Sequence, residues 1–158
     1  MVIKFNIKRF LISIAIPLSV GGLSALLTKD NMNFYSKIVT PTFVPPGWLF
    51  PVVWTILYLL MGVSLYLVWS SEAGIYEKRR ALVIFALQLL LNFIWSPIFF
   101  NMQWFLMAFI VLVLLWLFTF GMILSFYNIS KIAGILQIPY LLWLTFAGYL
   151  NLAIYILN

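Results

Sequence analysis

The stretch "PPGWLFPVVWTILYLLMG", from Pro45 to Gly62, decides the fold, because a rigid and aromatic entrance leads directly into a long apolar run. A membrane anchor needs only about 20 apolar residues. Pro51 falls in the first turn of the predicted helix, where the missing N–H of proline costs little. The prolines and tryptophans around this helix start exceed what spanning requires, so they indicate a function at this end.

The rest of the chain is equally apolar: 66% of its 158 residues are hydrophobic and 8% are charged. Soluble domains are about 25% charged. The uncharged run 81–130 is long enough for two spans, broken near Asn101-Met102-Gln103. The sequence therefore predicts an all-α membrane protein, a five-transmembrane-helix bundle forming a single domain over 1–158, with spans at about 9–27, 48–70, 81–100, 104–126 and 132–155.

The basic residues predict the orientation of the bundle. With the N-terminus inside, the outer segments hold only Lys29 and Lys37. The inner segments hold Lys4, Lys8, Arg9, Lys78, Arg79, Arg80 and Lys131. The positive-inside rule then places the N-terminus inside and the C-terminus outside, and a bacterial cytoplasmic membrane is expected. The net charge of +6 follows from this topology and does not indicate nucleic-acid binding.

The first span also has the basic start and apolar core of a signal peptide, but its length favours a retained helix. The chain has no Cys and no His, which excludes disulfides, thiol nucleophiles, histidine bases, haem ligation by these residues and ordinary zinc sites. Apart from Arg9 at the first residue of the first span, no acidic or basic residue lies inside a predicted span, which argues against an ion-coupled pump. Neither a cofactor nor a metal is predicted.

The segment 28–46 is the one long connection between spans. It combines Tyr35 and Phe43 with Pro41, Pro45 and Pro46, so it is stiff. Two interpretations stay open: a lid over a cavity, or an aromatic belt at the membrane interface.

Three further prolines lie deeper in their predicted spans. Pro17, Pro97 and Pro139 each remove one backbone hydrogen bond, which frees the carbonyl four residues earlier and bends the helix. Bent helices in a small bundle leave gaps, which are tolerated where neighbouring groups or a cavity satisfy the freed carbonyls.

The third span carries polar residues on one face. Gln88, Asn92, Trp95 and Ser96 are spaced i, i+4, i+7 and i+8, so they point to the same side of the helix. Amides in hydrocarbon are costly unless paired, so this face is expected to look into the bundle. Interhelical hydrogen bonding and a polar wall for a ligand are both consistent with it.

Aromatic residues follow helical spacing in two other spans. Trp54 and Tyr58 lie in the second, while Tyr140 and Trp143 lie in the fifth and are followed by Ala147 and by Leu150 or Asn151. Trp54 and Trp143 are set inside their helices, where an interfacial belt explains them less well. Rings with one polar atom suit planar aromatic ligands.

The motifs "PPGW…F…VWT…LYLLMG", "QLLLN…WS…FF" and "PYLLW…FA…LN" resemble those of the TspO/MBR family, the tryptophan-rich sensory proteins related to the animal translocator protein. The resemblance implies a five-helix bundle, commonly a homodimer in the lipid bilayer, with a cavity under the first loop that binds porphyrins or other planar hydrophobic molecules. Carried over by motif, the ligand site consists of Tyr35, Pro45, Trp54, Tyr58, Asn92, Trp95, Tyr140, Trp143, Ala147 and Leu150.

The chain departs from the family pattern in three places. Phe43 stands where the family often has Trp, and Pro51 lies one position earlier than the family's proline. Tyr155 is not followed by the Lys or Arg of the animal cholesterol motif, so sterol binding is not predicted.

Three functions compete. The preferred one is a porphyrin-binding sensor or carrier that performs no chemistry. The second is a light-dependent porphyrin-degrading enzyme that uses Trp54 and Trp143, because the chain offers no conventional catalytic group inside the membrane. The third is a membrane interaction protein without a small-molecule role.

Overall fold

The computed structural model describes residues 5–158, so Lys4, counted above among the inner basic residues, lies outside the described range. The elements are α1 (Ile7–Thr28), the 3₁₀ helix η1 (Lys29–Ser36), α2 (Leu49–Trp69), α3 (Ile75–Phe100), α4 (Phe105–Ile129), α5 (Lys131–Ile135) and α6 (Ile138–Leu157). Within this range, five helical segments are long and apolar enough to cross a membrane. The predicted all-α five-helix bundle is confirmed.

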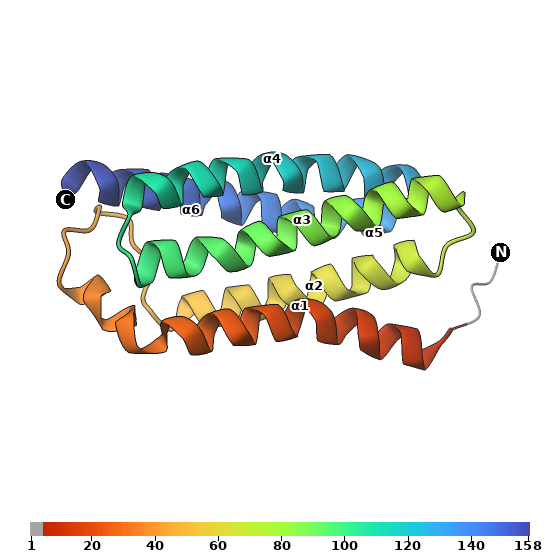
Figure 1. Ribbon diagram of the computed structural model, residues 1–158, viewed down its shortest axis with the longest axis horizontal. Helices are drawn as coiled ribbons and strands as arrows, with labels where there is room; N and C mark the ends of the chain where they lie inside the picture. Colours follow the sequence, from red (N-terminus) through yellow and green to blue (C-terminus); the bar gives the residue numbers. More distant parts are fainter. Residues whose placement is uncertain (1–4) are drawn as a thin grey trace.

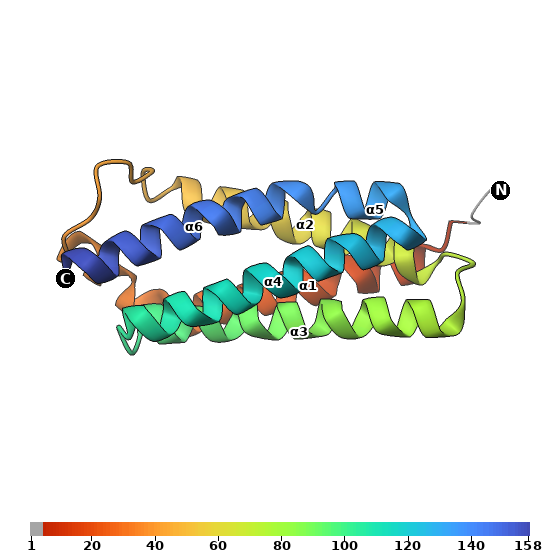
Figure 2. The same ribbon diagram turned by 90° about the horizontal axis from the view of Figure 1, so that it is seen from above.

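The long helices run side by side along the molecule (Figures 1 and 2). α1 packs on α2 and α3, and α4 packs on α3, α5 and α6. Segment 37–48, the α3–α4 turn and the C-terminus gather at one end. The α2–α3 connection and α5 lie at the opposite end (Figure 1).

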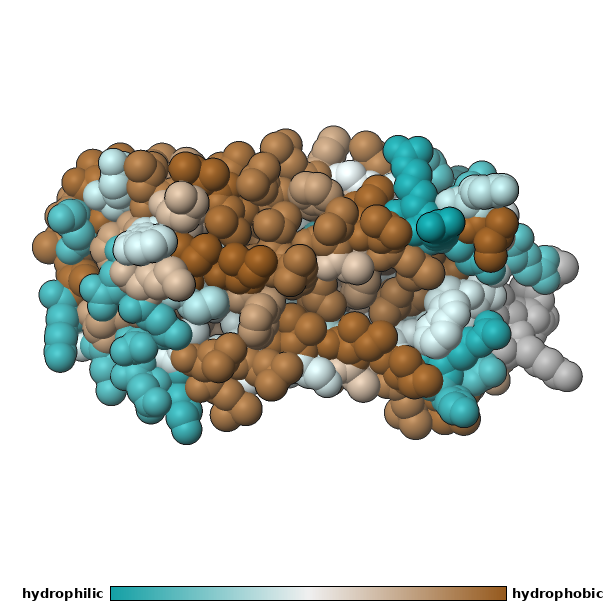
Figure 3. Space-filling view, in the orientation of Figure 1, coloured by the Kyte–Doolittle hydropathy of each residue, from teal (hydrophilic) through white to brown (hydrophobic). Residues whose placement is uncertain are grey.

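The surface is divided into an apolar band and two polar ends (Figure 3). Exposed Leu, Ile, Val and Phe side chains line the outer faces of the long helices, as Leu90, Ile110 and Leu142 illustrate. α2 has 21 residues, which at about 1.5 Å per residue span about 31 Å, the thickness of a bilayer core. The chain is therefore an integral, multi-pass membrane protein.

Glycine brings α1 and α2 into close contact. A Cβ atom added at Gly62 would lie 2.7 Å from Ile14 Cα and 2.9 Å from the Ser13 carbonyl oxygen. Both obstacles are backbone atoms, so no side-chain rotation relieves the overlap. The separation of the two helices is thus set by the absence of a side chain at residue 62.

Proline acts differently in the last span than the sequence analysis expected. Pro139 was placed inside one continuous helix, but the structure ends α5 at Ile135 and puts Pro139 in the first turn of α6. The Gln137 amide nitrogen donates to the Leu60 carbonyl (3.0 Å) and to Ser64 Oγ (2.7 Å), which ties this break to α2. Pro17 and Pro97 do lie inside their helices.

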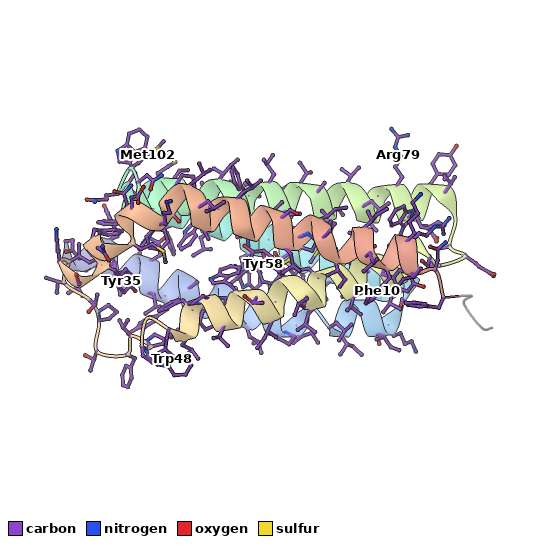
Figure 4. All side chains as sticks on the ribbon, turned by 90° about the horizontal axis from the view of Figure 1, so that it is seen from below. Phe10, Tyr35, Trp48, Tyr58, Arg79 and Met102 are labelled. Atoms are coloured by element: carbon purple, nitrogen blue, oxygen red, sulfur yellow. The ribbon has the colours of Figure 1, made fainter. Side chains whose placement is uncertain are left out.

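The third helix begins earlier than the predicted span. The predicted spans 48–70 and 81–100 leave residues 71–80 as a connection, but α3 starts at Ile75, so residues 75–80 form its charged first turns. Hydropathy identifies only the part of a helix that lies in lipid. Lys78, Arg79 and Arg80 belong to the same helix but lie outside that apolar part. Arg79 projects from this end of the bundle (Figure 4).

Substituting Gly62→Ala is expected to destabilise the bundle by about 1–3 kcal/mol, because the added methyl group overlaps the α1 backbone. The control is Gly121→Ala on α4, where a Cβ meets nothing within 4 Å. Denaturant or thermal unfolding in mild detergent measures the difference. Equal stability of the two variants would show that α1 and α2 are not held at this contact.

Candidate functional site

A hydrogen-bonded chain of two phenols and two amides crosses the interior of the bundle. The Tyr58 hydroxyl donates to Asn92 Oδ1 (2.7 Å), and Asn92 Nδ2 donates to the Tyr140 hydroxyl oxygen (2.8 Å). The Tyr140 hydroxyl in turn donates to Gln88 Oε1 (3.0 Å). We call these four buried residues the phenol–amide network. It joins α2, α3 and α6, so the amide face of α3 does look into the bundle.

Aromatic side chains continue from the network toward the loop end. The Trp54 ring stacks on Tyr58 (centroids 5.5 Å apart) and meets Tyr140 edge to face (6.2 Å). Phe50 makes edge contacts with Trp143 (5.8 Å) and with Tyr35 of η1 (6.3 Å). We call Tyr35, Phe50, Trp54 and Trp143 the aromatic column. The backbones of α2 and α6 have few close approaches, and these rings occupy the interval between them.

Two nitrogen donors in this region have no hydrogen-bond partner within residues 5–158: Trp143 Nε1 and Gln88 Nε2. Both atoms are buried. A buried N–H without a partner costs about 1–3 kcal/mol, so each such group in a native structure requires an explanation. An acceptor carried by a ligand would satisfy the Trp143 N–H, which lies in the aromatic column.

Trp95 belongs to a neighbouring arrangement. Its Nε1 donates to Asn151 Oδ1 (3.1 Å), and Asn151 Nδ2 donates to the Phe105 carbonyl (2.8 Å). The Trp95 ring stacks on Phe99 (5.1 Å) and also packs against the main core. Trp95 therefore lies at the boundary between the core around the network and a second cluster around Phe99.

Three predicted site residues remain, namely Pro45, Ala147 and Leu150. Leu150 is buried in α6, Ala147 is half-buried and packs against the main core, and Pro45 is half-buried in the segment before α2. This segment is tied to α6, because the Val39 N–H donates to Asn158 Oδ1 (3.0 Å) and Asn158 Nδ2 donates to the Val39 carbonyl (2.9 Å). Figure 4 shows Tyr35 at the loop end and Tyr58 in the middle of the bundle.

Three residues of this region were not among the predicted site residues. Gln88 lies one turn before Asn92, so its position on the same face was a usable signal. Phe50 precedes Pro51 in the opening stretch, but nothing in its spacing distinguished it from a core residue. Gly21 lies against the Tyr58 ring, a contact that the sequence of the first span does not indicate.

The chemistry available at the site is that of neutral groups. Phenol, amide and indole side chains line it, and within residues 5–158 no three His, Cys, Asp or Glu side chains gather where they would hold a metal ion. The arrangement suits a flat, largely apolar molecule that carries hydrogen-bond acceptors.

These features define a multi-pass helical membrane protein with an aromatic, amide-containing interior site. The model of the TspO/MBR family matches residues 13–157, and the chain belongs to that family. It is 42% identical to the tryptophan-rich protein TspO of Chlorobaculum tepidum, over 92% of each chain. It is 38% identical to the protein of the same name from Archaeoglobus fulgidus, over 97% of this chain and 99% of that one. It is 34% identical to the human translocator protein, over 84% of this chain and 79% of that one.

Substituting Tyr140→Phe is expected to destabilise the protein by about 1–3 kcal/mol, because it leaves Asn92 Nδ2 and Gln88 Oε1 buried without this partner. The control is Tyr149→Phe, which removes the hydroxyl of an exposed tyrosine on the same helix. Unfolding in detergent gives both values. A Tyr140→Phe protein as stable as the control would mean that the network does not hold the three helices together.

Proposed function

We propose that the protein is an integral membrane sensor or carrier that binds a protoporphyrin-type tetrapyrrole inside the bundle, under the 28–46 segment. The observation that carries this proposal is the convergence of the aromatic column on a buried Trp143 N–H that has no hydrogen-bond partner within residues 5–158. Relatives are named tryptophan-rich sensory protein, in Cereibacter sphaeroides, and translocator protein, in animals. These names support a sensory or carrier role.

The ligand would lie between α2 and α6. Trp54 and Trp143 offer apolar ring faces for a planar macrocycle, and the phenol–amide network forms the floor of the site. The Trp143 N–H would donate to a carboxylate of the ligand. Phe50, which now contacts both Tyr35 and Trp143, occupies the position at which the ligand would enter.

The segment 28–46 would act as the lid. Tyr35 of this segment contacts Phe50 of α2, and the Val39–Asn158 pair fastens the segment to the end of α6. Release of these two contacts would expose the column from the loop end, so binding and lid movement are coupled in this proposal.

The proposed orientation places η1 and the lid outside, with the N-terminus inside. The basic residues Lys78, Arg79 and Arg80 at the start of α3 support it, because basic residues are retained on the inner side. The working unit is proposed to be a homodimer in the lipid bilayer, which light scattering of the detergent-solubilised protein tests directly.

A second candidate function is light-dependent degradation of the porphyrin. The stacking of Trp54 on Tyr58 favours it, because adjacent electron-rich rings are able to donate an electron to an excited ligand. Loss of porphyrin absorbance under illumination, compared with a dark sample in the presence of oxygen, separates this enzyme from a sensor or carrier.

Protoporphyrin IX titrated in the dark is expected to quench tryptophan fluorescence of the parent protein saturably. Trp54→Phe and Trp143→Phe should each weaken binding about tenfold, the equivalent of about 1.4 kcal/mol. The control is Trp116→Phe on α4, whose N–H donates to Thr145 (2.8 Å) outside the aromatic column. Absence of saturable quenching in the parent would contradict tetrapyrrole binding, and equal weakening by all three variants would contradict this location.

Substituting Phe50→Ala is expected to increase the affinity for protoporphyrin IX several-fold, because the ligand no longer has to displace the ring that bridges Tyr35 and Trp143. The same titration measures it, with Phe120→Ala on the outer face of α4 as the control. Weaker binding by Phe50→Ala would show that Phe50 contacts the bound ligand and does not block its entry.

A further inference from the structure

We infer that Gly21 of α1 is a positioning residue for the ligand site, because its missing side chain provides the space in which the Tyr58 ring lies. The ligand named here is that of the proposed function, on which this inference rests. The role of Gly21 follows from the geometry of α1 and α2. Gly21 acts through Tyr58 and is not itself expected to contact the ligand.

The geometry separates two adjacent glycines. A Cβ atom at Gly21 would lie 2.6 Å from Tyr58 Cδ2 and 2.8 Å from Tyr58 Cζ, closer than the 3.0 Å that real Cβ atoms respect. A Cβ atom at Gly22 would meet nothing within 4 Å. Only the first glycine of the pair is therefore required by its surroundings.

The α1 and α2 backbones pack closely beside the Tyr58 ring, and moving α1 away from such a methyl group would lose that packing. Ile14 lies two helical turns before Gly21 on the same face of α1, and it is in backbone contact with Gly62 of α2. Tyr58 lies one turn before Gly62. The two contacts thus form one line along the α1–α2 interface, and the Gly62 contact fixes the helix separation beside Tyr58.

We expect the Tyr58 ring to move instead, and this ring makes two contacts within the site. It stacks on Trp54, and its hydroxyl donates to Asn92 at 2.7 Å. Displacement of the ring from α1 would weaken the stack, break the hydrogen bond and alter the wall against which a planar ligand would bind. A single methyl group on a helix outside the aromatic column is thereby expected to change the site.

The test compares Gly21→Ala with Gly22→Ala in the dark titration with protoporphyrin IX. Gly21→Ala should weaken binding about tenfold, equivalent to about 1.4 kcal/mol, while Gly22→Ala should stay within about twofold of the parent. In a Tyr58→Leu background, which lacks the ring, Gly21→Ala should cause no further loss, because the two positions act as one unit. Equal effects of the two alanine variants, or an undiminished loss in the Tyr58→Leu background, would overturn the inference.

A second readout does not depend on the ligand. It is the near-ultraviolet circular dichroism of the Trp54–Tyr58 stack, which is identified as the signal that Trp54→Phe removes. We expect this signal to change in Gly21→Ala and to persist in Gly22→Ala. If the parent does not bind protoporphyrin IX but this spectral difference appears, the proposed ligand is wrong and the positioning role stands. An unchanged spectrum in Gly21→Ala would overturn the positioning role whatever the parent binds.

The effect of helix packing alone is measured with Gly62→Ala, whose added methyl group overlaps the α1 backbone at Ser13 and Ile14. At temperatures where all variants are folded, it should keep the parent's affinity although its unfolding midpoint falls. A Gly62→Ala protein that loses affinity as strongly as Gly21→Ala would attribute the effect to helix separation and overturn the role of the ring.

Discussion

The structure depends on hydrogen bonds between amide and phenol side chains that are buried where they cannot bond to water instead. Asn92 and Gln88 lie on a helix otherwise surrounded by apolar side chains and lipid, where an unpaired amide costs several kcal/mol. Tyr58 and Tyr140 supply the partners from two other helices. Because hydrogen bonds demand specific distances, this network fixes how α2, α3 and α6 are rotated relative to one another, and the aromatic column is built on that rotation.

The two sides of α2 are organised in opposite ways. Toward α1, glycines at positions 21 and 62 let the two helices approach until backbone and ring atoms touch. Toward α6, large rings stand between helices whose backbones are farther apart. The proposed place for a flat ligand is the α6 side of α2, where aromatic rings and not helix backbones make the contacts.

The chemistry of the candidate site is consistent with the proposed binding role. Its groups are neutral, and its stacked rings and single N–H donors recognise shape and acceptor position more than charge. The pair formed by Val39 and Asn158 links the covering segment to α6, the helix that also carries Trp143. A ligand that displaced Phe50 from Trp143 would therefore alter the contacts of this segment at the membrane surface. The proposed sensor or carrier role requires such a change.

The sequence by itself determined the membrane class, the number of spanning helices and the inward face of α3, because a bilayer imposes apolar length and forbids unpaired amides on the lipid side. The resemblance to the TspO/MBR family grouped Trp54, Tyr58, Tyr140 and Trp143, and the structure packs these four in one core. Helical spacing gives the face on which a residue lies but not the partner across the interface. Only the tertiary structure therefore decided that Trp95 pairs with Asn151, that Phe50 contacts Trp143, and that Pro139 begins a new helix beside Gln137. The same limit applies to Gly21 and Gly22, which are equivalent in the sequence and differ because one of them faces a ring.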